Sequence, residues 1–221
     1  MKLNYFTMVL THDTPKTDTL DIWCTRRDLL LRESAYMTEY MLRAMNKEFK
    51  FDCARINLVC TEGPLKEGFK NFDGVHEIDV PFDYSYFSLT DVKEKEKYLY
   101  RALFEGTKIL CKTKIWDFAP FEKHLVQLRD DNFYVDFYHR VKQSPDKKTV
   151  AKLYCVQTMT EATFYIDFFV KRKLAQRKLC MVQRTESMLY NFRMNKLVWK
   201  DDKTVQVLNA IGRITTEVTM D

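Results

Sequence analysis

The stretch between residues 132 and 184 constrains the fold more than any other part of the chain. Side chains alternate strictly from Phe133 to Lys142: apolar residues and His139 occupy one set of positions, and tyrosines and charged residues occupy the other. Successive side chains of a β-strand point to opposite faces, so this pattern predicts a strand with one buried face. The sequence at 144–147, Ser-Pro-Asp-Lys, is typical of a turn. Residues 150–156 then return as a second strand.

The next segment is rich in Phe, Tyr, Ile and Val, but its apolar residues also recur at the helical spacing of three and four. These residues are Ala162, Tyr165, Ile166, Phe169, Val170 and Leu174. Thr158 and Glu161 have the spacing of a capping box, in which side chains satisfy backbone amides at the start of a helix. We therefore predict an amphipathic helix over residues 159–178, with cations near its C-terminal end. A strand is the alternative for this segment.

The same patterns predict the remaining elements. Further strands are expected at residues 3–10, 20–24, 54–60, 76–80, 179–182, 188–194, 197–200, 204–208 and 213–218. Further helices are expected at residues 25–49, 92–110 and 117–131.

These elements predict an α+β fold. It would be a largely antiparallel sheet of roughly eight to ten strands, with three to four helices packed mainly on one face. We expect a single domain over residues 1–221. The alternative is a division near residue 130, into a mixed α/β half (1–130) and a hairpin-helix-hairpin half (131–221).

Composition excludes some classes of function. The chain is 46% hydrophobic and 30% charged with a net charge of +5, which is typical of a globular protein. It has only five glycines, and phosphate-binding loops and tight catalytic turns depend on glycine, so a nucleotide-dependent enzyme is disfavoured. The six cysteines form no CxxC pair, which favours a reducing compartment. We see no signal peptide and no membrane-spanning run, and we expect a cytoplasmic protein without membrane contact.

The sequence shows no recognisable reaction centre. The four histidines, His12, His76, His124 and His139, lack the spacing of a metal site. Asp146, Asp201 and Lys203 could serve a metal-dependent nuclease, but they fall in predicted turns, where Asp and Lys are common for local reasons. We therefore predict no catalytic residue, no metal site and no cofactor, which favours a protein that is not an enzyme.

Two groups of residues are candidates for binding. The strongest local charge bias is formed by Lys171, Arg172, Lys173, Arg177, Lys178 and Arg184. Tyr84 and Tyr86 belong to an aromatic patch that could anchor an interface, because aromatic side chains supply contact area at low entropic cost.

We therefore predict a non-catalytic cytosolic protein-binding module whose partner is another protein. A stoichiometric inhibitor, such as an immunity protein for a toxin, is one example of this class. The first alternative is a nucleic-acid-binding protein that uses the basic 171–184 face, where cations would neutralise phosphates. The second is a metal-dependent nuclease or other hydrolase. The oligomeric state stays open.

Overall fold

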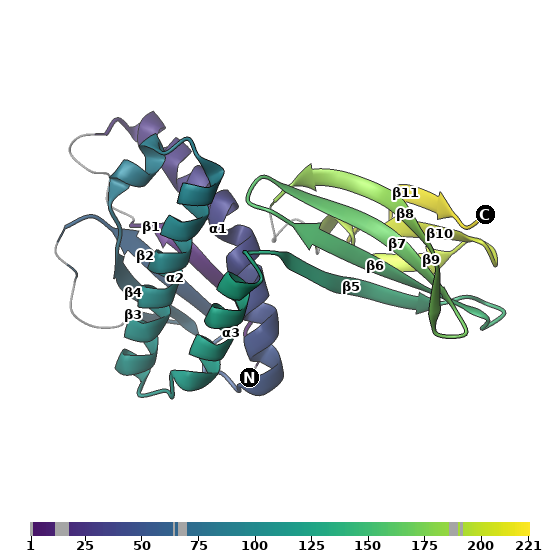
Figure 1. Ribbon diagram of the computed structural model, residues 1–221, viewed down its shortest axis with the longest axis horizontal. Coiled ribbons are helices and arrows are strands. Elements are labelled where there is room, and N and C mark those ends of the chain that lie inside the picture. The colour runs from purple at the N-terminus through teal and green to yellow at the C-terminus, as the bar shows by residue number, and fades with distance from the viewer. Residues whose placement is uncertain (1, 12–17, 64, 66–69, 186–189, 191) are drawn as a thin grey trace. The chain divides into compact units, whose positions relative to one another are not determined.

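The protein is described by a computed structural model that covers residues 2–11, 18–63, 65, 70–185, 190 and 192–221. It divides into two compact units, residues 1–133 and 134–221 (Figure 1). Within the described residues the chain forms three α-helices and three separate sheets, of four, four and three strands. The prediction of an α+β fold is confirmed. The prediction of one sheet with eight to ten strands is wrong, because the strands are divided among three sheets.

The N-terminal unit combines one sheet with all three helices. The sheet consists of β1 (Tyr5–Leu10), β2 (Arg55–Thr61), β3 (Lys70–Phe72) and β4 (Val75–Pro81), in the order β1-β2-β4-β3. The helices are α1 (Leu20–Glu48), α2 (Val92–Lys114) and α3 (Ala119–Asp130). A short 3-10 helix, η1 (Tyr84–Ser88), lies between β4 and α2.

The central strands of this sheet, β1, β2 and β4, are parallel, and only β3 runs antiparallel to its neighbour. The prediction of largely antiparallel strands is confirmed for the described strands taken together, and these central strands are the exception. The physical reason is the connection: α1 carries the chain back along the sheet between β1 and β2, and a crossover of this kind joins parallel strands.

The helices pack against one face of the sheet. Met8 of β1 lies opposite Leu58 of β2, and Val80 lies on the same face of β4, two residues beyond Ile78, the partner of Leu58. Met8, Leu58 and Val80 are fully buried. Gly106 of α2 lies so close to β2 and β4 that an added Cβ atom would be 2.7 Å from Val80 Cγ2 and 3.0 Å from Leu58 Cδ1. The lack of a side chain at Gly106 therefore sets how closely α2 approaches the sheet.

The C-terminal unit is built from two antiparallel sheets. The larger sheet is β5 (Val135–Gln143), β6 (Thr149–Gln157), β7 (Glu161–Val170) and β8 (Lys173–Arg184), in sequence order. The smaller sheet is β9 (Lys196–Trp199), β10 (Thr204–Leu208) and β11 (Ile214–Thr219), in the order β11-β10-β9. Figure 1 shows the two sheets as the two layers of this unit.

The core of the C-terminal unit contains side chains from both sheets. Phe164, Ile166 and Phe168 of β7 point into it, together with Trp199 and Val205 from the smaller sheet. Phe168 and Trp199 pack ring against ring with centroids 6.0 Å apart. Because these alternate residues of β7 are buried, the residues between them must point to the opposite face of the sheet.

The predicted helix over 159–178 is wrong, and so is the hairpin-helix-hairpin description of residues 131–221: this segment is the β7–β8 hairpin. The apolar residues of β7 fit both a helical and an alternating pattern, and the alternating pattern is the one that fills the core. The turn is formed by Lys171 and Arg172, which adopt φ values of 48° and 66°. Turns of this kind usually contain Gly or Asn, which tolerate positive φ. The sequence lacks that signal, so the turn was missed.

The predicted capping box at Thr158 is in fact the turn between β6 and β7. Thr158 Oγ1 accepts hydrogen bonds from the backbone N–H groups of Thr160, at 3.4 Å, and Glu161, at 3.2 Å. The Thr158 N–H donates to the Glu161 carbonyl at 2.8 Å. A threonine that caps a helix and a threonine that closes a turn make the same kind of bond to nearby amides. Local sequence could not distinguish the two.

Two other predicted strands are corrected. Residues 20–24 are the first part of α1, and Thr19 caps this helix by accepting a hydrogen bond from Ile22 N. Within the predicted strand 188–194, Tyr190, Phe192 and Arg193 are helical, and residues 188, 189 and 191 lie outside the described residues.

The hairpin around Asp201 is confirmed by β9 and β10, and the last predicted strand by β11. The expected helices after Ser88 and near Asp117 are confirmed by α2 and α3. None of the helices in the described ranges has the length and apolar character needed to cross a membrane.

The close contact at Gly106 predicts that alanine at this position destabilises the protein, the opposite of its usual effect inside a helix. Replacing a glycine inside a helix by alanine ordinarily stabilises the helix by about 1 kcal/mol. Here we expect Gly106→Ala to lower the free energy of unfolding by up to about 2 kcal/mol, because the new methyl group overpacks the contact with Val80 and Leu58. Urea unfolding followed by circular dichroism measures the change. Lys108→Ala, at an exposed position of the same helix, is the control and should change the stability by less than about 0.5 kcal/mol. A stabilising effect of Gly106→Ala would contradict the close packing.

Candidate functional site

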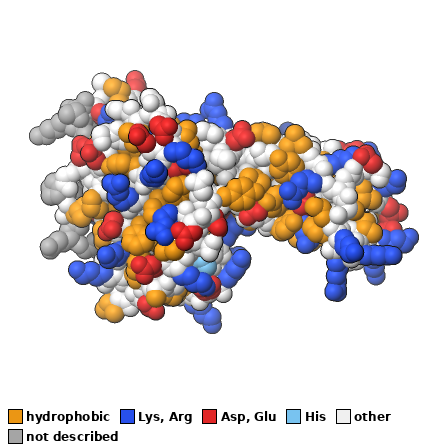
Figure 2. Space-filling model, viewed as in Figure 1, with side chains coloured by type: hydrophobic (Ala, Val, Ile, Leu, Met, Phe, Trp, Pro, Cys, Tyr) orange, Lys and Arg blue, Asp and Glu red, His pale blue; other side chains and the backbone are white. Residues whose placement is uncertain are grey.

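One face of the β5–β8 sheet carries the most distinctive surface of the C-terminal unit, and we call it the outer face. Residues directly opposite each other in antiparallel strands share a face. The outer face therefore follows from the residues of β7 that point away from the core, Thr163, Tyr165, Asp167 and Phe169, from their partners on β6 and β8, and from the partners of those β6 residues on β5. Tyr134, just before β5, belongs to the same face, because its hydroxyl is 3.4 Å from the hydroxyl of Tyr154. Figure 2 shows hydrophobic side chains gathered over these strands, with charged groups among them.

The centre of the outer face is a buried carboxylate. Asp167 is fully buried and is held by Arg177 of β8, whose Nε and Nη2 atoms donate to its two oxygens, each at 2.7 Å. Tyr138 of β5 donates a third hydrogen bond to Asp167 at 3.2 Å. The hydrogen bond and charge of Asp167 raise the pKa of Arg177 above its ordinary value, against the opposing effect of burial. Arg177 therefore stays charged at physiological pH.

Aromatic rings and cations surround this pair. The Arg177 guanidinium lies over the Tyr154 ring, 4.1 Å from its centroid, and Lys152 Nζ lies 4.3 Å from the centroid of Phe169. Tyr154 donates a short hydrogen bond to Asp136. Burial and this hydrogen bond raise the pKa of Tyr154, so its hydroxyl stays protonated. Arg177 and Lys152 lie over aromatic ring faces, and the hydroxyls of Tyr138 and Tyr154 each donate to a carboxylate. The polar groups at the centre of the outer face are therefore engaged with one another, which favours a structural role over a reactive one.

Around this centre, large apolar side chains are exposed to solvent. Six residues of the outer face are between 42% and 59% exposed: Tyr134, Tyr138, Val141, Leu174, Leu179 and Val182. Scattered apolar residues are common on protein surfaces, but a group on one continuous sheet face is typical of an interaction site.

The charges of the outer face balance. Among the described residues it carries three cations, Lys152, Arg177 and Arg184, and three acids, Asp136, Glu161 and Asp167, a net charge of 3 − 3 = 0. A surface that binds nucleic acid by neutralising phosphates needs an excess of cations. The outer face lacks this excess.

The structure disperses the predicted basic cluster. Lys171 and Arg172 form the β7–β8 turn, and Arg177 and Arg184 lie on the outer face. Lys178 points to the other side of β8 and pairs with Asp221, and Lys173 lies opposite Val170 at the start of β8. Successive residues of a strand point to opposite faces, so the cations that a helix would have brought close together are separated.

The two predicted aromatic anchors lie in the interior of the N-terminal unit. Tyr84 is 8% exposed and Tyr86 is fully buried. Tyr86 donates a hydrogen bond to Glu33 of α1 at 2.5 Å, and its ring packs edge-on or tilted against Phe82, Phe87 and Tyr98. Both tyrosines therefore hold η1 against the helices, and we do not include them in a surface for a partner.

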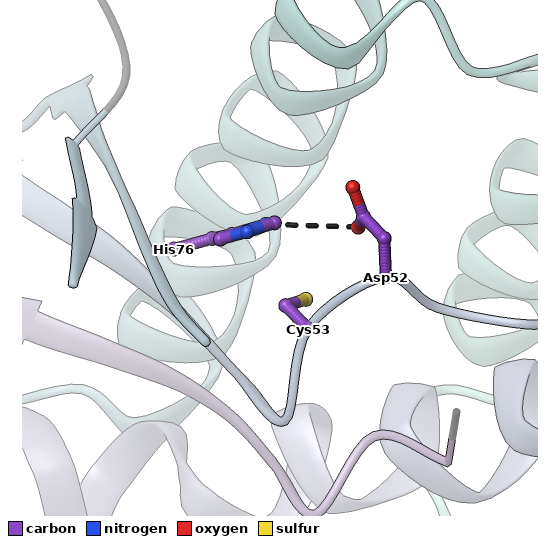
Figure 3. Close-up of side chains that lie close together, drawn as sticks. All are labelled: Asp52, Cys53 and His76. Atoms are coloured by element: carbon purple, nitrogen blue, oxygen red, sulfur yellow. Dashed lines mark ion pairs between the residues drawn. The ribbon is translucent and has the colours of Figure 1, made fainter. Parts of the chain in front are cut away.

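A separate cluster of side chains lies where β2 and β4 begin. Asp52 and Cys53 lie just before β2, separated from it by Ala54, and His76 is the second residue of β4 (Figure 3). The carboxylate, thiol and imidazole donor atoms all lie within 4.8 Å of one another, and this is the only such group of metal-ligating residues among those described. Asp52 Oδ1 is 3.8 Å from His76 Nδ1, and Asp52 Oδ2 is 2.6 Å from Lys114 Nζ of α2.

The surroundings decide the protonation of this cluster. Burial opposes ionisation of Asp52, but the hydrogen bond and charge of Lys114 outweigh it and lower the pKa of Asp52. Burial and the charge of Lys114 lower the pKa of His76, against the opposite effect of Asp52. Burial and the charge of Asp52 raise the pKa of Cys53 to about 11. At neutral pH the cluster therefore holds a carboxylate, a neutral imidazole and a thiol.

This protonation state does not suit nucleophilic catalysis. A reactive cysteine needs a depressed pKa and access to substrate, whereas Cys53 is fully buried and its pKa is raised. The same three donors are, however, suitable ligands for a metal ion. No local sequence signal indicates this cluster, because Asp52 and His76 are 24 positions apart and only parallel pairing of β2 with β4 brings them together.

The residues considered for a nuclease have local roles. Asp146 accepts hydrogen bonds from Ser144 Oγ at 2.7 Å and Lys148 N at 3.0 Å. Asp201 accepts from Lys203 N at 2.8 Å and Thr204 N at 2.7 Å. Each carboxylate closes its own turn, as their sequence context indicated. His12 lies outside the described residues.

The Asp167–Arg177 pair gives a testable prediction. We expect Arg177→Met to lower the free energy of unfolding by about 1–3 kcal/mol, because it leaves the buried Asp167 carboxylate without its charged partner. Lys178→Met is the matched control at the adjacent position. It removes an exposed pair with Asp221 and should cost less than about 0.5 kcal/mol. Urea unfolding of the two variants measures both changes, and equal losses would show that Asp167 does not depend on Arg177.

Comparison with known proteins adds no assignment to this geometry. The chain matches no protein-family model, no curated protein and no solved structure. The outer face and the Asp52 cluster are therefore the features from which a function can be inferred.

Proposed function

We propose that the protein is a non-catalytic binding module that holds another protein on the outer face of its β5–β8 sheet. The observation that carries this proposal is the set of six half-exposed apolar side chains on one face of a rigid sheet, around a charge-neutral centre. Aromatic residues and arginine are the side chains most enriched at the energetic centres of protein interfaces. The outer face contains four tyrosines, Tyr134, Tyr138, Tyr154 and Tyr165, and Arg177 at its centre.

The size of the outer face supports the proposal. Strands lie about 4.8 Å apart and rise about 3.3 Å per residue, so four strands of this length make a face of roughly 19 by 30 Å. Side chains add relief to this projected area. A stable protein complex buries about 800 Å² on each partner, and the outer face is of that order.

The charge distribution supports a protein partner over a nucleic acid. Arg177 is already engaged by Asp167, and the net charge of the outer face is zero. The complementary surface on a partner would be mainly apolar, with few unpaired charges, because a buried unpaired charge is costly. Stoichiometric inhibition of a toxin is one use of such a surface and stays a prediction.

Site-specific photo-crosslinking tests the proposal. A photoreactive amino acid at Leu179, 59% exposed on the outer face, should yield one discrete protein adduct in the cells that produce the protein. The same amino acid at Ile211, 63% exposed in the loop before β11, is the matched control and should not yield that adduct. The adduct should survive nuclease treatment. Identical adducts from both positions, no adduct from Leu179, or an adduct removed by nuclease would contradict the proposal.

Substitutions on the outer face test how much this surface contributes to the affinity of the complex. With the partner identified by its adduct, we expect Leu179→Asp to weaken the complex by at least about 10-fold, because it places a charge in an apolar contact. Leu179 is exposed, so the free energy of unfolding of the variant should be within about 0.5 kcal/mol of that of the wild type. Ile211→Asp is the control and should leave the affinity unchanged. Isothermal titration calorimetry measures both.

A further inference from the structure

We propose that Asp52, Cys53 and His76 bind a divalent transition-metal ion of the Zn²⁺ class. This site goes beyond the protein-binding function, because it lies in the N-terminal unit and shares no residue with the outer face. Their donor atoms lie within 4.8 Å of one another. Tetrahedral Zn²⁺ has bonds of about 2.0–2.3 Å, which place its ligands roughly 3.3–3.8 Å apart. Shifts of about 1 Å in side chains would therefore complete the geometry.

The backbone fixes the two ligand segments against each other. The Ala54 and Arg55 N–H groups both donate to the Gly74 carbonyl, at 2.9 and 3.2 Å. Ile56 of β2 is then in register with His76 of β4. These bonds hold the residues that precede β2 beside the first residues of β4. A site whose ligands are positioned by sheet hydrogen bonds loses little conformational freedom when an ion binds.

The donor types select the ion. A sulfur, an imidazole nitrogen and one carboxylate oxygen suit Zn²⁺ and related transition metals, whereas Mg²⁺ and Ca²⁺ prefer oxygen ligands. Three protein ligands leave a fourth tetrahedral position for water or a bound molecule. Cys53 and His76 are almost completely buried, and Asp52 is at the surface. The ion would therefore reach the cluster from the Asp52 side (Figure 3).

Lys114 completes the arrangement as a positioning residue. It holds Asp52 through Oδ2, while Oδ1 faces His76. Metal-binding carboxylates are commonly held in this way by a hydrogen bond to a second residue. Lys114 Nζ also lies 5.4 Å from the centroid of the Trp116 ring, which restricts the position of the ammonium group. When the ion binds, the Cys53 thiol forms a sulfur–metal bond and releases its proton to solvent.

Cobalt is the probe that tests this site, because Co²⁺ takes tetrahedral zinc sites and reports a thiolate ligand by a charge-transfer band. We expect the reduced full-length chain to bind one Co²⁺ with this band, and Zn²⁺ to displace the cobalt. Cys53→Ser should remove the band. Asp52→Asn changes an exposed side chain and should weaken binding by at least about 10-fold, the lower end of the effect of disturbing a metal site.

The other cysteines provide the control. Cys24 and Cys180 are the two that are not fully buried, so they are the thiols that could bind cobalt adventitiously. A variant with both replaced by serine should keep the band and the affinity of the wild type. Absence of the band in the wild type, its loss in this double variant, or unchanged affinity in Asp52→Asn would overturn the proposal. The Asp52→Asn result stands even if Cys53→Ser fails to fold. Crosslinking from Leu179 should be unaffected by Asp52→Asn, so this proposal and the protein-binding function can fail separately.

Discussion

The alternation of side chains along β7 is the constraint on which the C-terminal unit depends. Phe164, Ile166 and Phe168 fill the core between the two sheets, and this obliges Tyr165, Asp167 and Phe169 to face outward. A shift of register by one residue would exchange the two sets. It would place the Asp167 carboxylate among the aromatic side chains of the core, where an unpaired charge is strongly destabilising. The register of β7 in its sheet therefore determines both which residues pack in the core and which side chains form the outer face.

That register also determines what the outer face can recognise. Asp167 is fully buried and needs a cationic partner, and Arg177, directly opposite on β8, supplies it. The pair removes from the surface the arginine that would otherwise be available for phosphates. The remaining exposed surface is apolar at Leu174, Leu179 and Val182. A face of this composition gains more from excluding water against an apolar partner than from attracting a polyanion.

In the N-terminal unit, the pairing of parallel strands determines which metal-ligating side chains lie together. Parallel pairing of β2 with β4 places the residues that precede one strand beside the first residues of the other. Asp52, Cys53 and His76 meet for this reason, and Lys114 reaches them from the last turn of α2. The closeness of α2 to the sheet, which Gly106 permits, fixes the helix that carries Lys114. Packing in the N-terminal unit and the geometry of the Asp52 cluster are thus linked.

The sequence by itself determined the elements whose patterns have one interpretation. The strand β5, the Asp201 turn between β9 and β10, and the start of α2 could be predicted because each signal is local. The strict alternation predicted for β5 is wrong after Tyr138, because a bulge at His139 shifts the register and places Val141 on the outer face. The strand β7 could not, since its apolar residues satisfy two periods at once and Thr158 can close a turn as well as cap a helix. The turn at Lys171 and Arg172 could not be predicted either, because it contains no glycine or asparagine.

Only the tertiary structure decided the rest. The strand assignment of β7 separates Arg177 from Lys178 and buries Asp167, so the predicted basic cluster never forms one surface. Tyr84 and Tyr86 are interior residues because the helices of the N-terminal unit cover η1, and nothing in their sequence distinguishes them from exposed tyrosines. Asp52 and His76 come together only through pairing of strands that are distant in the chain. Periodicity reports which side of an element is buried, whereas long-range pairing and burial decide which polar side chains meet.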